Sequence, residues 1–338
     1  MEQDDIGLLR EAMFYDVDND KRIECRLCPH HCQLKADQLG LCRVRRNDGG
    51  VLHTLNYGEV TALALDPIEK KPLYHFYPGT MILSAGTFGC NLSCSFCQNH
   101  HIAHEINNGR TILPETMVNI CHQAKIEGSV GLAFTYNEPS IWFEYIYDTA
   151  KLLKDADMKV VLITNGYIEL KPLEKLLPLI DAMNIDLKAF NDHFYKKNCQ
   201  ARIEPVKKVI EKASSHTHVE ITTLIITGEN DREKEINELT KWLASINPDI
   251  PLHLSRYYPA YKFVNEPTPI KTMEIAYDTA RQHLNFVYLG NLHGIENNTY
   301  CLDCGALLVK RNAYNIKIID LKGNNCAKCG KDIDYIVN

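Results

Sequence analysis

The chain has 338 residues, of which 45% are hydrophobic and 24% are charged, and its formal net charge is −6 at pH 7. These values are typical of a globular protein with one large domain and small additions. The chain lacks the strong excess of basic residues with which nucleic-acid-binding proteins bind phosphates. The acidic N-terminus lacks the pattern of a signal peptide, and no apolar run reaches the roughly 18 residues of a membrane span, so we expect a cytoplasmic protein.

The thirteen cysteines are unevenly distributed. All except Cys121 and Cys199 fall into three groups with short spacers. Because cytosolic thiols stay reduced, such groups predict metal sites before they predict disulfides. The groups are Cys25, Cys28, Cys32 and Cys42; Cys90, Cys94 and Cys97; and Cys301, Cys304, Cys326 and Cys329.

The first group lies in residues 1–75, which we predict to be a cysteine-rich metal-binding segment. Its four cysteines can close a site around zinc or around a second iron–sulfur cluster, and their spacing does not separate these two readings. A structural metal is the favoured reading, because so short a segment cannot bury a core of its own. The segment could also gate a binding site or receive a partner protein.

Residues 76–295 alternate between short apolar runs rich in β-branched or aromatic residues and helix-length segments with helical spacing of apolar residues. Strands that alternate with helices imply parallel strands joined by right-handed crossovers. We therefore predict an α/β fold in which residues 76–295 form a partial (β/α)6-type TIM barrel. The predicted strands are 81–86, 129–136, 158–164, 182–188, 218–227, 251–258 and 285–290. The predicted helices are 114–127, 138–156, 204–214, 231–246 and 271–284.

Polar and charged residues recur where these strands end. A three-cysteine loop follows the first strand, Asn137 and Glu138 follow the second, and Asn165 follows the third. Asp186 and Lys188 end the fourth strand. Because the carboxyl ends of barrel strands converge on one mouth, we expect these residues to share a site there.

The loop itself reads GCNLSCSFCQN, with Cys90, Cys94 and Cys97 spaced C-x3-C-x2-C. A [4Fe-4S] cluster usually takes four cysteines, so three would leave one iron open to a ligand. The alternative is a zinc site that His100, His101 or His104 completes. A closed zinc site would not account for the polar strand ends.

The last group, in residues 296–338, consists of two C-x2-C pairs, each followed by glycine. Cys301 and Cys304 form the first pair, and Cys326 and Cys329 form the second. This pattern predicts a zinc ribbon whose metal supplies folding energy that about forty residues otherwise lack.

Several of these motifs resemble a known family. Cys90, Cys94, Phe96 and Cys97 match the C-x3-C-x-aromatic-C signature of the radical S-adenosylmethionine (radical SAM) enzymes. More narrowly, the chain resembles the pyruvate formate-lyase activating enzyme branch, and within it the radical SAM enzymes of the AmmeMemoRadiSam system. The phrases that carry this likeness cover most of the chain: CRLCPHHC, GLCRVR, ALALDPIEKKPLYHF, GCNLSCSFCQN, TYNEPSIWFEY, TNGYI, NIDLKAF and TYCLDCGALL.

The resemblance implies that Cys90, Cys94 and Cys97 hold a [4Fe-4S] cluster whose open iron binds SAM. It also implies that six residues at the strand ends contact SAM. This chain departs from the family pattern at two places. Tyr136 and Asn137 replace two glycines of the family's GGE segment, and Ile163 replaces an acid of the activating enzymes. No residue is assigned a catalytic role. The expected SAM contacts are Tyr136, Asn137, Glu138, Asn165, Asp186 and Lys188.

The implied activity is reductive cleavage of SAM to a 5'-deoxyadenosyl radical that abstracts hydrogen from an unidentified substrate. The expected partners are a flavodoxin-like or ferredoxin-like electron donor and Memo-like and Amme-type proteins, and neither a membrane nor a nucleic acid is expected. The alternative function is a metal-stapled module that binds RNA or protein, with a structural or electron-transfer cluster at Cys90, Cys94 and Cys97.

Overall fold

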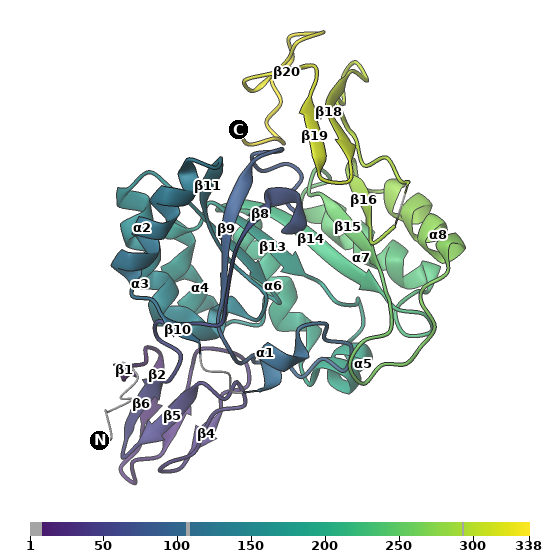
Figure 1. The fold of residues 1–338 in the computed structure, drawn as a ribbon. Helices are drawn as coiled ribbons and strands as arrows, with labels where there is room; N and C mark the ends of the chain where they lie inside the picture. Colours follow the sequence, from purple (N-terminus) through teal and green to yellow (C-terminus); the bar gives the residue numbers. More distant parts are fainter. Residues whose placement is uncertain (1–8, 106–108, 293) are drawn as a thin grey trace.

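The computed structural model describes residues 9–105, 109–292 and 294–338. Its centre is a twisted eight-stranded sheet in the order β16-β15-β14-β13-β12-β11-β9-β8 (Figure 1). All neighbouring strands from β9 to β16 are parallel, and only β8 pairs antiparallel. The strands are β8 (Ala62–Pro67), β9 (Met81–Gly86), β11 (Ser129–Phe134), β12 (Lys159–Thr164), β13 (Ala182–Asp186), β14 (His218–Ile225), β15 (Leu252–Arg256) and β16 (Val287–Gly290).

The predicted α/β class and parallel order are confirmed, since each of the seven predicted strands overlaps one parallel strand of this sheet. The sheet is open, because β8 and β16 occupy its two ends and do not pair with each other in the part of the chain that the structure describes. β8 was not predicted, and it lies within residues 1–75 although it belongs to the central sheet. The predicted domain boundaries at residues 75 and 295 stay predictions.

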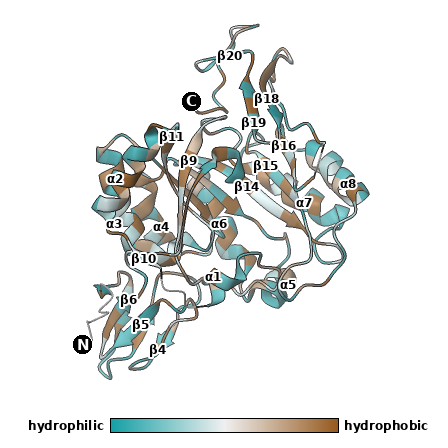
Figure 2. Cartoon of the chain, viewed as in Figure 1, coloured by the Kyte–Doolittle hydropathy of each residue, from teal (hydrophilic) through white to brown (hydrophobic). Residues whose placement is uncertain are grey.

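Helices follow the strands and bury one face each against the sheet, as the brown and teal sides of the ribbons indicate (Figure 2). In α6, for example, the buried residues Val206, Val209, Ile210 and Ala213 recur at the three- and four-residue spacing of one helix face. Sequence periodicity predicted five of these helices but not α4. The long helices are α2 (Pro114–Lys125), α3 (Phe143–Asp155), α4 (Leu170–Leu176), α6 (Ile203–Ser214), α7 (Glu233–Ile246) and α8 (Ile270–Arg281).

Short helical turns make several of the connections. They are η1 (Ile68–Lys70), α1 (His100–His104), η2 (Pro139–Trp142), η3 (Leu177–Leu179), α5 (Asp192–Phe194) and a π-helical turn, η4 (Tyr195–Cys199). α1 and the pair α5 and η4 lie at the carboxyl end of the sheet, where the loops after the strands gather (Figure 1).

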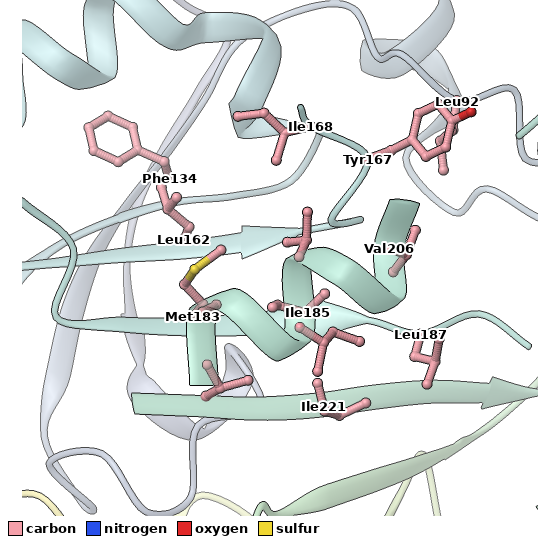
Figure 3. Packing of buried hydrophobic residues seen from close by; sticks show 14 of the residues in the cluster. Leu92, Phe134, Leu162, Tyr167, Ile168, Met183, Ile185, Leu187, Val206 and Ile221 are labelled. Carbon is pink, nitrogen blue, oxygen red and sulfur yellow. The ribbon is translucent and has the colours of Figure 1, made fainter. Parts of the chain in front are cut away.

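The core lies between the sheet and its helices. Met183 and Ile185 of β13 lie between Leu162 of β12 and Ile221 of β14, and Val206 of α6 covers them (Figure 3). The same buried cluster continues to Leu92, which lies beside Tyr167 beyond the strand ends. The loop that carries the three cysteines is therefore anchored in the main core.

The N-terminal segment forms two small antiparallel sheets, ordered β1-β6-β5 and β2-β3-β4, near α1 (Figure 1). Arg45 of β5 and Glu144 of α3 join this segment to the core through a buried ion pair of 2.5 Å, with both side chains only 1% exposed. The strands are β1 (Arg10–Glu11), β2 (Tyr15–Val17), β3 (Ile23–Cys25), β4 (Gln33–Leu34), β5 (Arg45–Asp48), β6 (Val51–Thr54) and β7 (Glu59–Val60), the last paired with β10 (Arg110–Thr111).

The C-terminal segment sits at the opposite end of the sheet (Figure 1). Arg311 of β18 anchors it by donating hydrogen bonds to the backbone carbonyl of Tyr74 and to the hydroxyl of Thr299. No helix in the described ranges is long and apolar enough to cross a membrane. The strands are β17 (Thr299–Tyr300), β18 (Leu307–Asn312), β19 (Asn315–Ile318), β20 (Leu321–Lys322) and β21 (Asn325–Cys326).

The buried ion pair gives a stability prediction. Glu144→Ala leaves the Arg45 guanidinium buried without its carboxylate, so we expect the free energy of unfolding to fall by about 3–5 kcal/mol. Anaerobic urea denaturation of both proteins measures the difference. Lys196→Ala removes an exposed ion pair, with Lys196 67% exposed, and is expected to cost about 0.5 kcal/mol or less. Equal losses in the two variants would contradict the role given to Glu144.

Candidate functional site

A cavity of about 540 Å³ opens at the carboxyl ends of β9, β11, β12 and β13. Its size is within the range of sites for small molecules and cofactors. The structure brings all nine side chains predicted for the cluster and for SAM to this one cavity. They are Cys90, Cys94, Cys97, Tyr136, Asn137, Glu138, Asn165, Asp186 and Lys188.

The loop after β9 is held in place by backbone contacts that require glycine. Gly89 has a φ of 89°, and a Cβ atom there would lie 2.6 Å from the carbonyl oxygen of Cys42. Asn137 clamps the same loop, since its Nδ2 donates to the carbonyl of Gly89 at 2.8 Å and its Oδ1 accepts from the amide of Thr87 at 3.2 Å. The N-terminal segment and the end of β11 therefore position the loop from two sides.

The sulfur of Cys90 lies among N–H donors. The amide of Leu92 donates to it at 3.4 Å, and Nδ2 of Asn165 lies 3.9 Å away. Burial and the nearby carboxylate of Glu138 raise the pKa of the Cys90 thiol well above its usual value. The thiolate form therefore requires a cationic centre beside it, and N–H donors to sulfur are among the features that set the potential of an iron–sulfur cluster.

Glu138 lies buried beneath this loop. One carboxylate oxygen accepts from the amide of Ser140 at 2.8 Å and from the hydroxyl of Thr164 at 2.7 Å, and the other accepts from the amide of Asn165 at 2.7 Å. Burial raises the pKa of Glu138 although these bonds oppose the rise. The carboxylate ties the ends of β11 and β12 together and keeps capacity for one further donor.

Lys188 supplies a positive charge at the mouth of the cavity. Its Nζ lies 2.9 Å from Oδ2 of Asp186 and 5.9 Å from the centre of the Phe96 ring. Burial opposes its charge, but Asp186 and the sulfurs of Cys94 and Cys199 raise the pKa of Lys188 well above its usual value. Lys188 is therefore a fixed cation suited to a carboxylate.

Cys199, which sequence reasoning did not place, lies beside the three-cysteine loop. The amides of Ser93 and Ser95 donate to the carbonyls of Cys199 and Asn198 at 3.1 and 3.0 Å, so the loop pairs with η4 on both sides of Cys94. The buried thiol of Cys199 hydrogen bonds with Cys94; this bond lowers the pKa of Cys94 and raises that of Cys199 well above its usual value. No spacing in the sequence signals this contact across more than a hundred residues.

Sequence reasoning also missed Asp66, Lys70 and Lys71, which line the cavity from β8 and the turn after it. Asp66 accepts hydrogen bonds from Lys71 at 2.9 Å, from Tyr136 at 2.8 Å and from Lys70 at 3.1 Å. Burial opposes ionisation, yet these bonds lower the pKa of Asp66 to about 2. The three residues lie in the phrase ALALDPIEKK, whose charge pattern gave no strand signal.

The C-terminal cysteines converge as predicted for a metal site. The Sγ atoms of Cys301 and Cys329 lie 3.8 Å apart, and those of Cys304 and Cys326 lie 3.7 Å apart. A tetrahedral ion with metal–sulfur bonds of about 2.3 Å holds its sulfurs about 3.8 Å apart. The four ligand atoms all lie within 4.8 Å of one another, so this group could hold one metal ion.

Comparison with known proteins places this site in a family. An uncharacterized protein of Methanocaldococcus jannaschii is 42% identical over 340 residues, which cover 97% of this chain and 100% of that protein. Residues 85–240 match the radical SAM superfamily. This part of the chain belongs to the radical SAM superfamily. The matched residues run from the end of β9 into α7 and include the three-cysteine loop.

Two further likenesses agree with radical SAM membership. A protein of the same archaeon, provisionally named a glycyl-radical enzyme activating enzyme, is 28% identical over 205 residues that cover 56% of this chain and 74% of that protein. A radical SAM methyltransferase structure from Sphaerobacter thermophilus has a TM-score of 0.51 at 15% identity, over 63% of this chain and 67% of that one, and it shows the fold alone. The relationship to activating enzymes is therefore supported, whereas the AmmeMemoRadiSam assignment stays a prediction.

Radical SAM membership implies a [4Fe-4S] cluster and SAM, and the chain's residues fit both. Three cysteines line one cavity, N–H donors surround the sulfur of Cys90, and acidic and basic side chains lie across from them. Membership also supports an enzyme with SAM-dependent radical chemistry.

The contact between Cys199 and Cys94 gives a prediction about the cluster. With a cluster bound through Cys94, Cys199→Ala would remove one hydrogen bond to the Cys94 sulfur, so we expect the reduction potential to become more negative. A bond worth ~1 kcal/mol corresponds to about 40 mV for one electron. Redox titration monitored by EPR measures the shift, and Cys121→Ala, on α2 outside the cavity, is the control.

Two outcomes would contradict this role for Cys199. An unchanged potential would mean that no such bond forms. A spectrum that changes in the variant even before SAM is added would mean that Cys199 itself binds the cluster.

Proposed function

We propose that this radical SAM protein binds a [4Fe-4S] cluster through Cys90, Cys94 and Cys97 and cleaves SAM reductively in the adjoining cavity. The observation that carries the proposal is that one cavity of about 540 Å³ is lined by three cysteines after β9, by the carboxylate of Glu138 after β11, and by Asp186 and the partly buried cation of Lys188 at the end of β13. When bound, the cluster supplies one electron to the SAM sulfonium, which gives methionine and a 5'-deoxyadenosyl radical able to remove hydrogen from a substrate.

The charged side chains suit the two ends of an amino acid. Lys188 would bind the carboxylate of SAM, because it is the fixed cation of the cavity. Asp186 and the remaining capacity of Glu138 would accept the amino group. Tyr136 and Asn137 would contact SAM from the end of β11, and Asn165 would hold the Cys90 sulfur in place.

Apolar side chains form one part of the remaining cavity lining, beside polar residues such as Asp66, Lys70 and Asn291. Leu92, Phe96, Ala103 and Leu224 contribute to this lining. Phe96 packs against Phe194 and Phe263, with ring centres 5.7 and 5.9 Å apart, so the loop carries its own apolar wall. An apolar wall beside a reactive intermediate limits the access of water to it and so limits side reactions.

For the substrate we propose a hydrogen donor on a partner protein, because the chain is similar to a protein provisionally named a glycyl-radical enzyme activating enzyme. Memo-like and Amme-type proteins are the proposed partners, on the likeness of the motifs to the AmmeMemoRadiSam enzymes. A flavodoxin-like or ferredoxin-like protein in the cytoplasm is the proposed electron donor.

The cleavage reaction is tested with anaerobically reconstituted protein, SAM and dithionite. We expect 5'-deoxyadenosine to form and the EPR signal of the reduced cluster to change when SAM is added. Cys94→Ala is expected to abolish both, and Lys188→Ala is expected to weaken SAM binding about 10-fold or more, the size of one hydrogen bond to a charged group. Lys196→Ala, an exposed lysine outside the cavity, serves as the control.

The proposal would fail if fully loaded protein formed no 5'-deoxyadenosine and Cys94→Ala matched the parent. Candidate partner proteins added to the same reaction, followed by mass spectrometry of every component, would identify the molecule that loses hydrogen. If SAM is still cleaved but none of the candidate partner proteins is modified, only the proposed substrate class is contradicted.

We also propose that the C-terminal cysteines hold zinc. The expected metal content is about one zinc per chain, and Cys326→Ser is expected to lose it and to unfold at a lower temperature, because the metal organises residues 299–338. Metal analysis and thermal melts measure the two effects. Zinc retained at full occupancy in Cys326→Ser would contradict the assignment.

A further inference from the structure

The four N-terminal cysteines come from a short stretch of the chain that lies beside the three-cysteine loop. The amide of Cys25 donates to the carbonyl of Cys32 at 3.0 Å, which pairs their backbones. The sulfurs of Cys32 and Cys42 lie 3.8 and 3.6 Å from the point where a Cβ atom on Gly40 would stand. The thiol of Cys28 is buried, and it is close enough to the other three cysteines for their sulfurs to contribute to the raised pKa of Cys28.

The spacing of these sulfurs differs from that of the C-terminal group. Among the described residues, only the C-terminal four have ligand atoms that all lie within 4.8 Å of one another. The N-terminal four do not meet this spacing. A cubane of four irons and four sulfides is larger than one ion and holds its thiolates further apart. The N-terminal arrangement therefore fits a cluster better than it fits zinc.

A buried arginine also faces the N-terminal cysteines. Nη1 of Arg45 lies 4.0 Å from the sulfur of Cys25, and the side chain is 1% exposed. Its Nε is buried and has no hydrogen-bond partner in the described chain. A buried donor without a partner is costly, and the sulfides of a cluster would add acceptors that a zinc ion lacks.

The N-terminal site touches the residues on both sides of Cys90. The carbonyl of Cys42 abuts Gly89, and Nε2 of His30, between Cys28 and Cys32, lies 2.7 Å from the carbonyl oxygen of Asn91. A path from the Cys42 sulfur to the Cys90 sulfur therefore runs along covalent bonds except at one step. At that step the carbonyl oxygen of Cys42 contacts Gly89 through space. Cys32, the least buried of the four, puts the other side of the site near the surface.

We propose that Cys25, Cys28, Cys32 and Cys42 hold a second [4Fe-4S] cluster that relays electrons to the site at Cys90, Cys94 and Cys97. The relay rests on the proposed function, whereas the second cluster itself does not. A flavodoxin-like or ferredoxin-like donor is oxidised by one electron as the second cluster is reduced. The second cluster returns to its oxidised form as the electron passes on, and no proton or group moves. Four protein ligands close this cluster, so it carries electrons and does not bind SAM.

The test compares Cys28→Ala/Cys32→Ala with the parent chain and with Cys121→Ala as a matched control. Two ligands are removed together, because three cysteines alone can retain a cluster. With four irons in each cluster, we expect about eight irons per chain in the parent and control and about four in the double variant. Zinc content and the SAM-dependent change of the dithionite-reduced EPR signal are expected to stay the same. Reduction of the Cys90 site by reduced flavodoxin is expected to slow 10-fold or more.

Other results would overturn the proposal. Unchanged iron with about one zinc fewer would make the N-terminal site a zinc site, and unchanged iron and zinc would leave it without a metal. Loss of four irons with an unchanged rate of reduction by flavodoxin would exclude the relay. Cys94→Ala separates this test from that of the proposed function, because it removes the SAM response and leaves the N-terminal irons. A thermal melt shows whether the double variant is folded, and Cys25→Ala/Cys42→Ala repeats the measurement if it is not.

Discussion

The buried carboxylate of Glu138 is the interaction on which the cavity depends. A charge without water is stable only when hydrogen bonds replace its hydration, and here three donors from Ser140, Thr164 and Asn165 do so. Two of these donors belong to the next strand end, so one carboxylate fixes the separation of β11 and β12. Asn165, held in this way, reaches the Cys90 sulfur. The position of the sulfur thus follows from a polar network beneath it.

The two ends of the sheet serve different purposes. At the carboxyl end, polar groups face an open cavity. At the amino end, Glu220 binds His218 and His253 at 3.0 and 2.6 Å and accepts from the amides of Tyr74 and His75, and the C-terminal segment covers this network. Burial lowers the pKa of His75 to about 3, so that histidine stays neutral while it hydrogen bonds with Tyr288 at 2.6 Å. Such satisfied, buried groups stabilise the fold and leave chemistry to the other end.

Much of the central fold could be predicted from sequence, because strands of a parallel sheet are apolar on both faces and read as continuous runs, such as MILSAG and KVVLIT. β8, an antiparallel edge strand with Leu63 exposed and Asp66 turned to the cavity, was not predicted because its apolar run ALAL ends after four residues. α4 was not predicted because a seven-residue helix has too few turns to show a helical spacing of apolar residues.

The residues in and around the cavity likewise fall into those that sequence patterns reveal and those that they do not. Cys90, Cys94 and Cys97 are visible in one short motif, and Asn137, Glu138, Asn165, Asp186 and Lys188 are visible because strand ends converge. Cys199, Asp66 and Arg45 acquire their importance from tertiary contacts with residues far away in the chain, and no local pattern marks them.

The contact between Gly89 and the Cys42 carbonyl bears on how the three-cysteine loop keeps its shape. The final shape of the loop depends on the N-terminal segment, because the carbonyl oxygen of Cys42 and the side chain of Val44 lie against Gly89. A shortened protein that lacks these residues would leave Gly89, and the three cysteines that follow it, without that support.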